Sequence, residues 1–138
     1  MPRFPTDEWF QDFIGRINAS EEYAGAAANW EGEVAFVIEA EPDRGLPEDV
    51  WATLDLWHGA CRGGGVIAEE AASQAPFVIR ASLSRWREVL EGDLDPVRGM
   101  VQGKLKLRGD LPTILRYVRA SSELVHLTEL VDTTYPEV

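Results

Sequence analysis

The chain has 138 residues and a formal net charge of −11 at pH 7, and 45% of its residues are hydrophobic. This length and composition suit one folded domain spanning residues 1–138 and exclude disordered and fibrous classes. A negative field repels phosphate groups, so we expect neither nucleic-acid binding nor membrane docking through a basic patch.

Cysteine content and targeting signals indicate an intracellular protein. Cys61 is the only cysteine, which rules out an internal disulfide and a cysteine-rich zinc site. No apolar leader segment is recognisable near the N-terminus, and no apolar run approaches the length of a membrane span. We therefore expect a cytoplasmic location and no stable insertion into a membrane.

Residues 1–29 are predicted to form N-terminal helices. Thr6 precedes Asp7 and Glu8, which is the pattern of an N-cap followed by acids that the helix dipole favours. Apolar residues then recur at helical spacing, namely Phe10, Phe13, Ile14 and Ile17. Ser20 starts a second helix in the same way.

Residues 30–109 are predicted to form a sheet with inserted helices. Apolar and polar residues alternate along five predicted strands, at residues 33–41, 50–58, 66–69, 77–81 and 104–108. Such alternation is typical of an antiparallel sheet with one covered face and one wet face. Gly63, Gly64 and Gly65 are interpreted as a turn, and Trp30, Trp51 and Trp57 as partly exposed residues of strand ends or of the wet face.

The predicted helices supply the cover of this sheet. Trp86 and Leu90 lie on a helix that follows the fourth strand, and Asp95 with Pro96 marks the next helix start. Residues 110–138 are predicted as a C-terminal helical cover that Ser121 and Ser122 interrupt. The expected fold class is α+β, with a five-stranded, mainly antiparallel sheet covered by helices on one face.

Candidate chemical groups are sparse in this sequence. Asp55, His58 and Cys61 have a spacing of three, but in a strand that spacing sends side chains to opposite faces, so we expect them to diverge. His126 has no second histidine nearby, and the three glycines lack the Lys-Ser/Thr ending of a phosphate-binding loop. We therefore predict no catalytic residue, no metal site and no cofactor.

Two strings of residues resemble a known family. Trp86 to Pro96 reads Trp-x-x-Val-Leu-x-Gly-x-Leu-Asp-Pro, and Gly103 to Asp110 reads Gly-Lys-Leu-Lys-Leu-x-Gly-Asp. In this order and spacing they resemble the sterol carrier protein 2 (SCP2) family of lipid-transfer domains, in its stand-alone bacterial form. The resemblance implies an apolar tunnel between sheet and helices that holds fatty acids, acyl-CoA, phospholipids or sterols.

The resemblance implies a lipid-binding role for apolar residues on both sides of such a tunnel. On the sheet side we expect Phe36, Ile38, Leu54, Leu56, Phe77, Ile79, Leu105 and Leu107. On the helical side we expect Trp86, Leu90, Met100, Leu115, Val118, Leu124 and Leu127. The same residues could instead fill a solid core, and the sequence does not separate a core from a cavity.

The leading hypothesis is a non-enzymatic carrier of a long-chain lipid or fatty acid. The alternative is an interaction module, a homodimer joined through the tryptophans of the wet face, with a vestigial pocket. Sedimentation of a Trp51 or Trp57 variant would separate the two, because only the dimer should fall apart.

Overall fold

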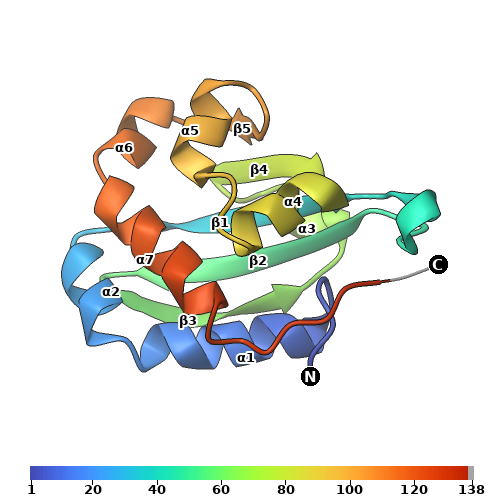
Figure 1. Cartoon of the computed structure of the whole chain (residues 1–138). Coiled ribbons are helices and arrows are strands. Elements are labelled where there is room, and N and C mark those ends of the chain that lie inside the picture. Colours follow the sequence, from blue (N-terminus) through green and yellow to red (C-terminus); the bar gives the residue numbers. More distant parts are fainter. Residues whose placement is uncertain (137–138) are drawn as a thin grey trace.

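One five-stranded sheet forms the centre of the structure. A computed structural model describes residues 1–136, in which the strand order is β3-β2-β1-β4-β5 (Figure 1). The strands are β1 (Glu31–Glu39), β2 (Val50–Trp57), β3 (Ala60–Val66), β4 (Phe77–Ser82) and β5 (Lys106–Arg108). The pair β1–β4 is parallel and the other three pairs are antiparallel, which confirms the predicted fold class.

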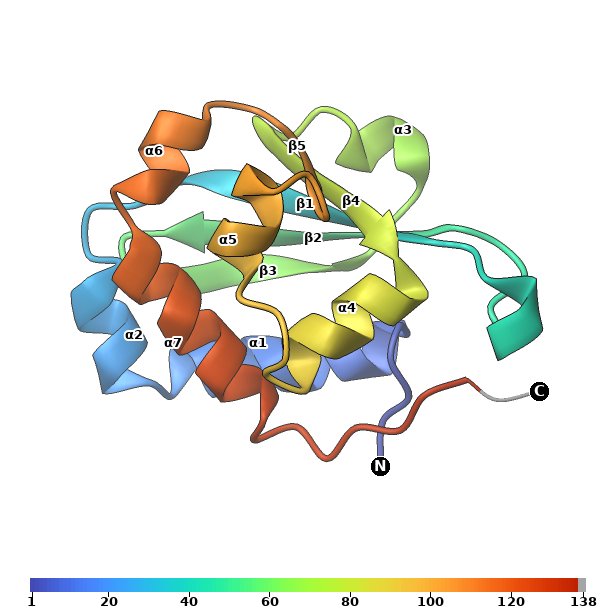
Figure 2. The ribbon, with the colours of Figure 1, turned by 45° about the horizontal axis from the view of Figure 1, so that its top comes forward.

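Helices surround the sheet on three sides. They are α1 (Asp7–Asn18), α2 (Glu21–Ala26), α3 (Glu69–Ala72), α4 (Leu83–Leu90), α5 (Pro96–Val101), α6 (Leu111–Leu115) and α7 (Val118–Thr128), with a 3₁₀ turn η1 (Pro42–Arg44). Helices α4, α5 and α7 cover one face of the sheet, and α1 runs along its β3 edge (Figures 1 and 2). Residues 137 and 138 of the predicted C-terminal cover lie outside the described residues.

The predicted helix starts are confirmed by side-chain caps. Thr6 accepts a hydrogen bond from the Trp9 N–H, and Ser20 accepts one from the Tyr23 N–H. Asp95 caps α5 in the same way, and Asp110 caps α6. Each cap satisfies one of the N–H groups that a helix leaves without an internal partner.

Alternation along the strands places apolar side chains beneath the helices. Val34 and Phe36 of β1 pair with Leu54 and Ala52 of β2, and all four belong to the main core or pack against it. The opposite face is less wet than predicted. There α3 and the residues after it cover Ala35, Val37 and Val78 with Ala72 and Ala75, forming a small second core.

Side chains of α1 take the place of a sixth strand beside β3. Asp7 Oδ1 accepts a hydrogen bond of 2.9 Å from the Val66 N–H, and Gln11 Nε2 donates one of 2.9 Å to the Gly64 carbonyl. A strand at the edge of a sheet otherwise exposes unpaired N–H and C=O groups, which promote association with other chains. Helix α1 therefore closes this edge.

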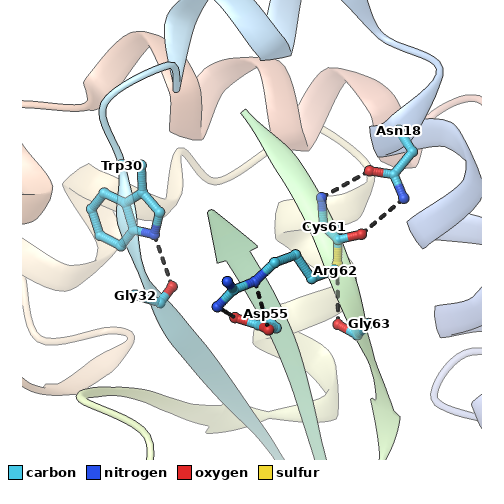
Figure 3. A network of polar contacts seen from close by, with 7 residues as sticks. All are labelled: Asn18, Trp30, Gly32, Asp55, Cys61, Arg62 and Gly63. Atoms are coloured by element: carbon cyan, nitrogen blue, oxygen red, sulfur yellow. Dashed lines mark hydrogen bonds and ion pairs between the residues drawn. The ribbon is translucent and has the colours of Figure 1, made fainter. Parts of the chain in front are cut away.

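Asn18 completes the attachment of α1 at the other end of β3. Its Oδ1 accepts from the Cys61 N–H at 2.8 Å, and its Nδ2 donates to the Cys61 carbonyl at 2.9 Å (Figure 3). One amide side chain thus reproduces both bonds that a neighbouring strand would make. Positions 7, 11 and 18 lie on one face of α1, so a single helix orientation satisfies all these groups.

The prediction of a turn at Gly63–Gly65 is wrong, because these residues lie within β3. The turn between β2 and β3 instead falls at residues 58–59, where His58 has a φ of 49°. A Cβ on Gly64 would lie 2.1 Å from the Thr53 carbonyl oxygen of β2. The glycines permit close contact between the backbones of β2 and β3, and this contact, rather than a turn, accounts for their presence.

Gly65 explains how α1 comes close enough to bond with the edge of β3. A Cβ at this position would lie 2.3 Å from Asp7 Oδ1 and 2.5 Å from Gln11 Nε2. Its φ of +127° is also a backbone conformation that residues with a side chain rarely adopt. Glycine here serves the contact between helix and strand.

Three other predicted boundaries are wrong. The strand predicted at residues 66–69 ends at Val66, and Glu69 begins α3. The strand predicted at residues 104–108 begins only at Lys106, although Leu105 is fully buried. The helical break predicted at Ser121 and Ser122 falls instead at residues 116–117, between α6 and α7.

Replacing Asn18 by Ala should destabilise the protein by about 2–3 kcal/mol, because the Cys61 N–H and C=O would both lose their partner in a partly buried place. The exposed Asn29 serves as the control, since an exposed substitution usually changes stability by less than about 0.5 kcal/mol. Urea unfolding of the two variants measures the difference. Equal stability of the two would show that water replaces the Asn18 side chain without cost.

Glu41 should contribute stability that depends on acid pH. Desolvation raises the pKa of this carboxylate, but hydrogen bonds from the Ser84 N–H at 2.6 Å and the Ser84 hydroxyl at 2.9 Å, with Arg44 nearby, outweigh it and hold the pKa below its usual value. As the pH falls, Glu41 is therefore protonated at a higher pH in the unfolded chain than in the folded chain. Its stabilising contribution is present above the unfolded pKa of about 4.3 and is lost as the pH falls through the lower pKa of the folded state.

The Glu41→Gln variant tests this contribution. Its urea midpoint should fall less between pH 6 and pH 3 than the midpoint of the unaltered protein. The exposed Glu48→Gln is the control. A Glu48→Gln variant with the same reduced pH dependence would contradict the assignment to Glu41.

Candidate functional site

An apolar cavity of about 140 Å³ lies between the sheet and the covering helices. Residues of α1 and α2 line it at one end, and residues of β1, β2 and β4 form its sheet side. Helices α4 to α7 and the segments that join them close it from above. The lining residues are Phe4, Trp9, Phe10, Phe13, Tyr23, Trp30, Val34, Phe36, Ile38, Leu54, Leu56, Ile79, Trp86, Val89, Leu90, Pro96, Met100, Ile114, Tyr117, Ala120, Ser121, Leu124, Val125 and Thr128.

Aromatic rings from the N-terminal segment form one wall of the cavity. The Trp9 ring contacts Phe4, Phe10 and Phe13 with centroid separations of 4.8, 5.0 and 5.1 Å. Trp9 Nε1 donates to Thr133 Oγ1 at 2.8 Å, which satisfies its polar group within this cluster. The wall is therefore rigid and apolar toward the cavity.

Two further tryptophans are fixed by hydrogen bonds to the backbone. Trp86 Nε1 donates to the Val37 carbonyl at 2.9 Å, and Trp30 Nε1 donates to the Gly32 carbonyl at 2.9 Å (Figure 3). The predicted partial exposure of Trp30 is wrong, because it is buried against Phe77. Trp30 directly precedes β1, and its ring is part of the cavity lining.

The lining contains few polar groups and no charged residue. Its hydroxyls belong to Tyr23, Tyr117, Ser121 and Thr128. Tyr117 Oη donates to the Asn29 carbonyl at 3.1 Å, and Thr128 Oγ1 donates to the Val125 carbonyl at 2.6 Å. A ligand in this space would meet apolar surface almost everywhere.

Tyr23 differs from the bonded hydroxyls. Its side chain is buried, and its hydroxyl makes no hydrogen bond with the described part of the chain. Burial, with a smaller effect of the nearby Cys61, raises the pKa of this phenol well above its usual value. The surroundings of Tyr23 therefore disfavour the charged phenolate, so its hydroxyl stays a neutral hydrogen-bond donor.

The partly buried residues of its lining indicate that the cavity meets solvent on the side of the covering helices. The lining residues buried most deeply belong to the sheet, such as Ile38 and Leu54, which are fully buried. Met100 of α5 and the α7 residues Ser121 and Leu124 are only partly buried. Side chains of these two helices thus form the border between the cavity and solvent, in the region where α5 and α7 lie over the sheet (Figure 2).

Nine of the residues predicted to bind lipid line the cavity, namely Phe36, Ile38, Leu54, Leu56, Ile79, Trp86, Leu90, Met100 and Leu124. The other six lie elsewhere. Phe77, Leu105 and Leu127 are buried in the core, and Leu107 packs against it. Leu115 and Val118 are exposed to solvent by 44% and 46%.

The break between α6 and α7 explains the position of Leu115 and Val118. One uninterrupted helix would place residues 114, 115 and 118 on one face. The chain instead leaves the helix at residues 116–117, and Tyr117 enters the cavity lining. Ile114 stays buried while Leu115 and Val118 point outward.

The sequence analysis missed the N-terminal wall of the cavity. The helical spacing of Phe10 and Phe13 predicts an apolar face, but that pattern is the same for a helix that packs on a solid core. Tyr23 and Tyr117 carried no signal at all. The concentration of aromatic residues at positions 4, 9, 10 and 13 is the one feature that could have indicated an unusual surface there.

Asp55, His58 and Cys61 diverge, as the strand pattern predicts. Asp55 forms an ion pair with Arg62 at 3.0 Å, and His58 Nε2 lies 2.5 Å from a carboxylate oxygen of Glu31 (Figure 3 shows Asp55 and Cys61). Cys61 is buried on the other face, and burial raises the pKa of its thiol. Among residues 1–136, no group of three His, Cys, Asp or Glu side chains is arranged to hold a metal ion.

Arginines of the chain lie over the tryptophans of the opposite sheet face, which stay partly exposed as predicted, Trp57 by 37%. The Arg62 guanidinium lies 4.5 Å from the Trp57 ring centroid, and that of Arg80 lies 5.2 Å from the Trp51 ring centroid. Each arginine is also ion-paired with an acid. Dimerisation through this face stays a prediction.

None of the helices described is both long and apolar enough to cross a bilayer.

Comparisons with known proteins identify a family and solved structures with the same fold. Residues 10–120 match the model of the SCP-2 sterol transfer family. A crystal structure of sterol carrier protein 2 is 41% identical, with a TM-score of 0.82, over 91% of this chain and 97% of that chain. A conserved hypothetical protein from Thermus thermophilus, described as possibly a sterol carrier protein, is 40% identical, with a TM-score of 0.83, over 94% of this chain and 90% of that one.

A more distant structure shares the fold. Apo sterol carrier protein 2 from Yarrowia lipolytica is 18% identical, with a TM-score of 0.55, over 87% of this chain and 89% of that chain. No curated protein matches the chain. The family match covers most of the sequence, including all five strands and helices α2 to α6, so the chain belongs to the SCP-2 sterol transfer family.

Proposed function

We propose that this protein is a non-enzymatic lipid carrier that holds an acyl chain or a similar apolar group in the cavity beneath α5 and α7. The observation that carries the proposal is the lining of 24 residues without a charged side chain. An apolar cavity stays dry and takes apolar ligands. Membership of the SCP-2 sterol transfer family supports the same assignment.

The size of the cavity indicates that the cover moves when a lipid enters. Its volume of about 140 Å³ is smaller than the roughly 300–1,000 Å³ of pockets that enclose larger ligands. Helices α5 and α7 border the opening, whereas the sheet is held by its backbone hydrogen bonds. We therefore expect these two helices to move apart, as covering segments do in other binding proteins.

The chemistry of the lining limits the kind of lipid. Each buried methylene contributes about 0.8 kcal/mol, and part of the sum is offset by the loss of freedom on binding. A carboxylate would find no cationic partner inside the cavity, because no Lys, Arg or His lines it. A fatty acid would thus keep its head group at the opening, and a neutral lipid could enter completely.

The same lining argues for a carrier rather than an enzyme. General acid or base catalysis needs a group that titrates near the working pH. Tyr23 and Tyr117 are the lining residues with an ionisable side chain, and burial raises the pKa of Tyr23 further from neutrality.

We place the protein in the cytoplasm as one domain spanning residues 1–138.

Filling the cavity should weaken lipid binding. Ala120 is buried in the lining, and an Ala120→Phe side chain would occupy the space of several methylenes. We expect the affinity for a fluorescent fatty acid to fall at least tenfold, measured by titration. Ala71→Phe, on the exposed side of α3, should bind as the unaltered protein does. Unchanged binding by a folded Ala120→Phe variant would refute the proposal.

Tyr23 should favour lipids that carry a neutral oxygen. A hydrogen bond of about 0.5–1.5 kcal/mol corresponds to a two- to tenfold change in affinity, so Tyr23→Phe should bind a long-chain alcohol more weakly by that factor. Displacement of the fluorescent fatty acid measures the affinity, and an alkyl chloride of equal length should bind both proteins equally. Tyr117→Phe is the matched control, because its hydroxyl already bonds to Asn29. Equal losses for both ligands would rule out the hydrogen bond.

A further inference from the structure

Residues 98–119 carry a charge opposite to that of the chain as a whole. They contain six of its 13 Lys and Arg residues and one of its 24 Asp and Glu residues, Asp110. Their formal charge is therefore +5, whereas the entire chain has −11. The six cations are Arg98, Lys104, Lys106, Arg108, Arg116 and Arg119.

These cations are not neutralised by acids of the protein. Six of the remaining seven cations, Arg16, Arg44, Arg62, Arg80, Arg85 and Arg87, each form an ion pair. Within residues 1–136, none of the six cations of residues 98–119 does so. Arg108 donates hydrogen bonds to the Ser73 and Ala75 carbonyls, and Arg116 donates one to Thr113 Oγ1. These acceptors are uncharged, so they do not offset the positive charge of either arginine.

The same segment of the chain carries exposed apolar side chains. Val101 of α5 is 61% exposed. Leu115 of α6 and Val118 of α7 are 44% and 46% exposed. All six cations are exposed too. Helices α5 and α6, strand β5 and the start of α7 lie on the side of the molecule away from α1 (Figures 1 and 2).

This segment adjoins the lining of the cavity. Val101 follows Met100, which lines the cavity on α5. Val118 likewise follows Tyr117, which lines the cavity at the start of α7. A structure that docks through residues 98–119 would therefore lie next to the place where a lipid enters.

We propose that residues 98–119 form a docking surface for an anionic lipid bilayer. Cations near such a bilayer are each attracted to its negative surface, and apolar side chains among them enter the boundary between head groups and acyl chains. Nucleic acid would satisfy the cations but offers the three apolar side chains no comparable partner. Along the sequence, Asp93 and Asp95 precede this segment and Glu123 follows it, so the positive charge is limited to residues 98–119.

This inference reverses the expectation drawn from net charge. Exposed charges are screened beyond about 8–10 Å at physiological ionic strength. The attraction of a bilayer to residues 98–119 therefore depends on the charge of this segment and not on the charge of the whole chain. The acids that make the chain negative lie mainly outside this segment. The proposal rests on this distribution of charge and does not require that the cavity be occupied.

Flotation with lipid vesicles tests the proposal. The protein should bind vesicles of phosphatidylcholine that contain phosphatidylglycerol and should not bind vesicles of phosphatidylcholine alone. Because each cation is worth about 1 kcal/mol, or roughly fivefold in affinity, the variant Lys104→Gln/Lys106→Gln/Arg119→Gln should bind about 100-fold more weakly. Val101→Ser should weaken binding several-fold without changing its salt dependence.

A matched variant removes the same number of charges elsewhere. Arg16→Gln/Arg44→Gln/Arg85→Gln loses three ion-paired cations outside the surface and should bind vesicles within about threefold of the unaltered protein. Urea unfolding verifies that both triple variants are folded. Equal losses in both variants, binding to neutral vesicles, or no binding at all would overturn the proposal, as would tighter binding to a DNA oligonucleotide than to the anionic vesicles.

The experiment is independent of the carrier function. Flotation measures association with the bilayer, and titration with the fluorescent fatty acid in free solution measures the cavity. The Lys104, Lys106 and Arg119 variant should keep its affinity in solution, because none of these residues lines the cavity. Failure of one measurement therefore leaves the other conclusion intact.

Discussion

The open edge of β3 is the constraint on which the rest of the structure depends. Its backbone groups must find partners, and α1 supplies them through Asp7, Gln11 and Asn18. Once this polar face of α1 is fixed on the strand, another face of the same helix carries Trp9, Phe10 and Phe13 to the end of the cavity. The bonds that close the sheet thus also build the aromatic wall of the binding site.

The cavity is maintained at a cost in stability. The atoms that line an unfilled apolar space of about 140 Å³ lack packing contacts on that side. Rings that are fixed at their polar ends resist collapse into this space, as the bonds of Trp86 to Val37 and Trp9 to Thr133 illustrate. A bound lipid would recover the lost contacts, which joins ligand binding to the stability of the fold.

The sequence could predict those parts of the fold that depend on local patterns. Alternation along β1 and β2 gave the correct inward face, and the caps at Thr6 and Asp95 gave the correct helix starts. Gly63–Gly65 misled because glycine serves both turns and close backbone contact, and only the position of α1 decides between them. The conclusion that a long glycine run must bend fails for this reason.

The candidate site was predictable on its sheet side and less so on its helical side. Ile38, Leu54 and Ile79 follow from strand period alone. The helical side depends on where α6 ends and α7 begins, and no strong helix-breaking residue stands at positions 116–117 to reveal it. The charge of residues 98–119 is visible in the sequence, but the average over the whole chain conceals it.

The attachment of the two ends of the described chain restricts how the cover can move. The Phe4 N–H donates to the Thr134 carbonyl at 2.8 Å, and the Thr134 N–H donates to the Pro2 carbonyl at 3.0 Å. These bonds hold the segment that follows α7 against the start of the chain. They restrain the C-terminal end of α7, so a displacement that keeps them intact would be larger toward Val118, where it must release the Tyr117 hydrogen bond to the Asn29 carbonyl.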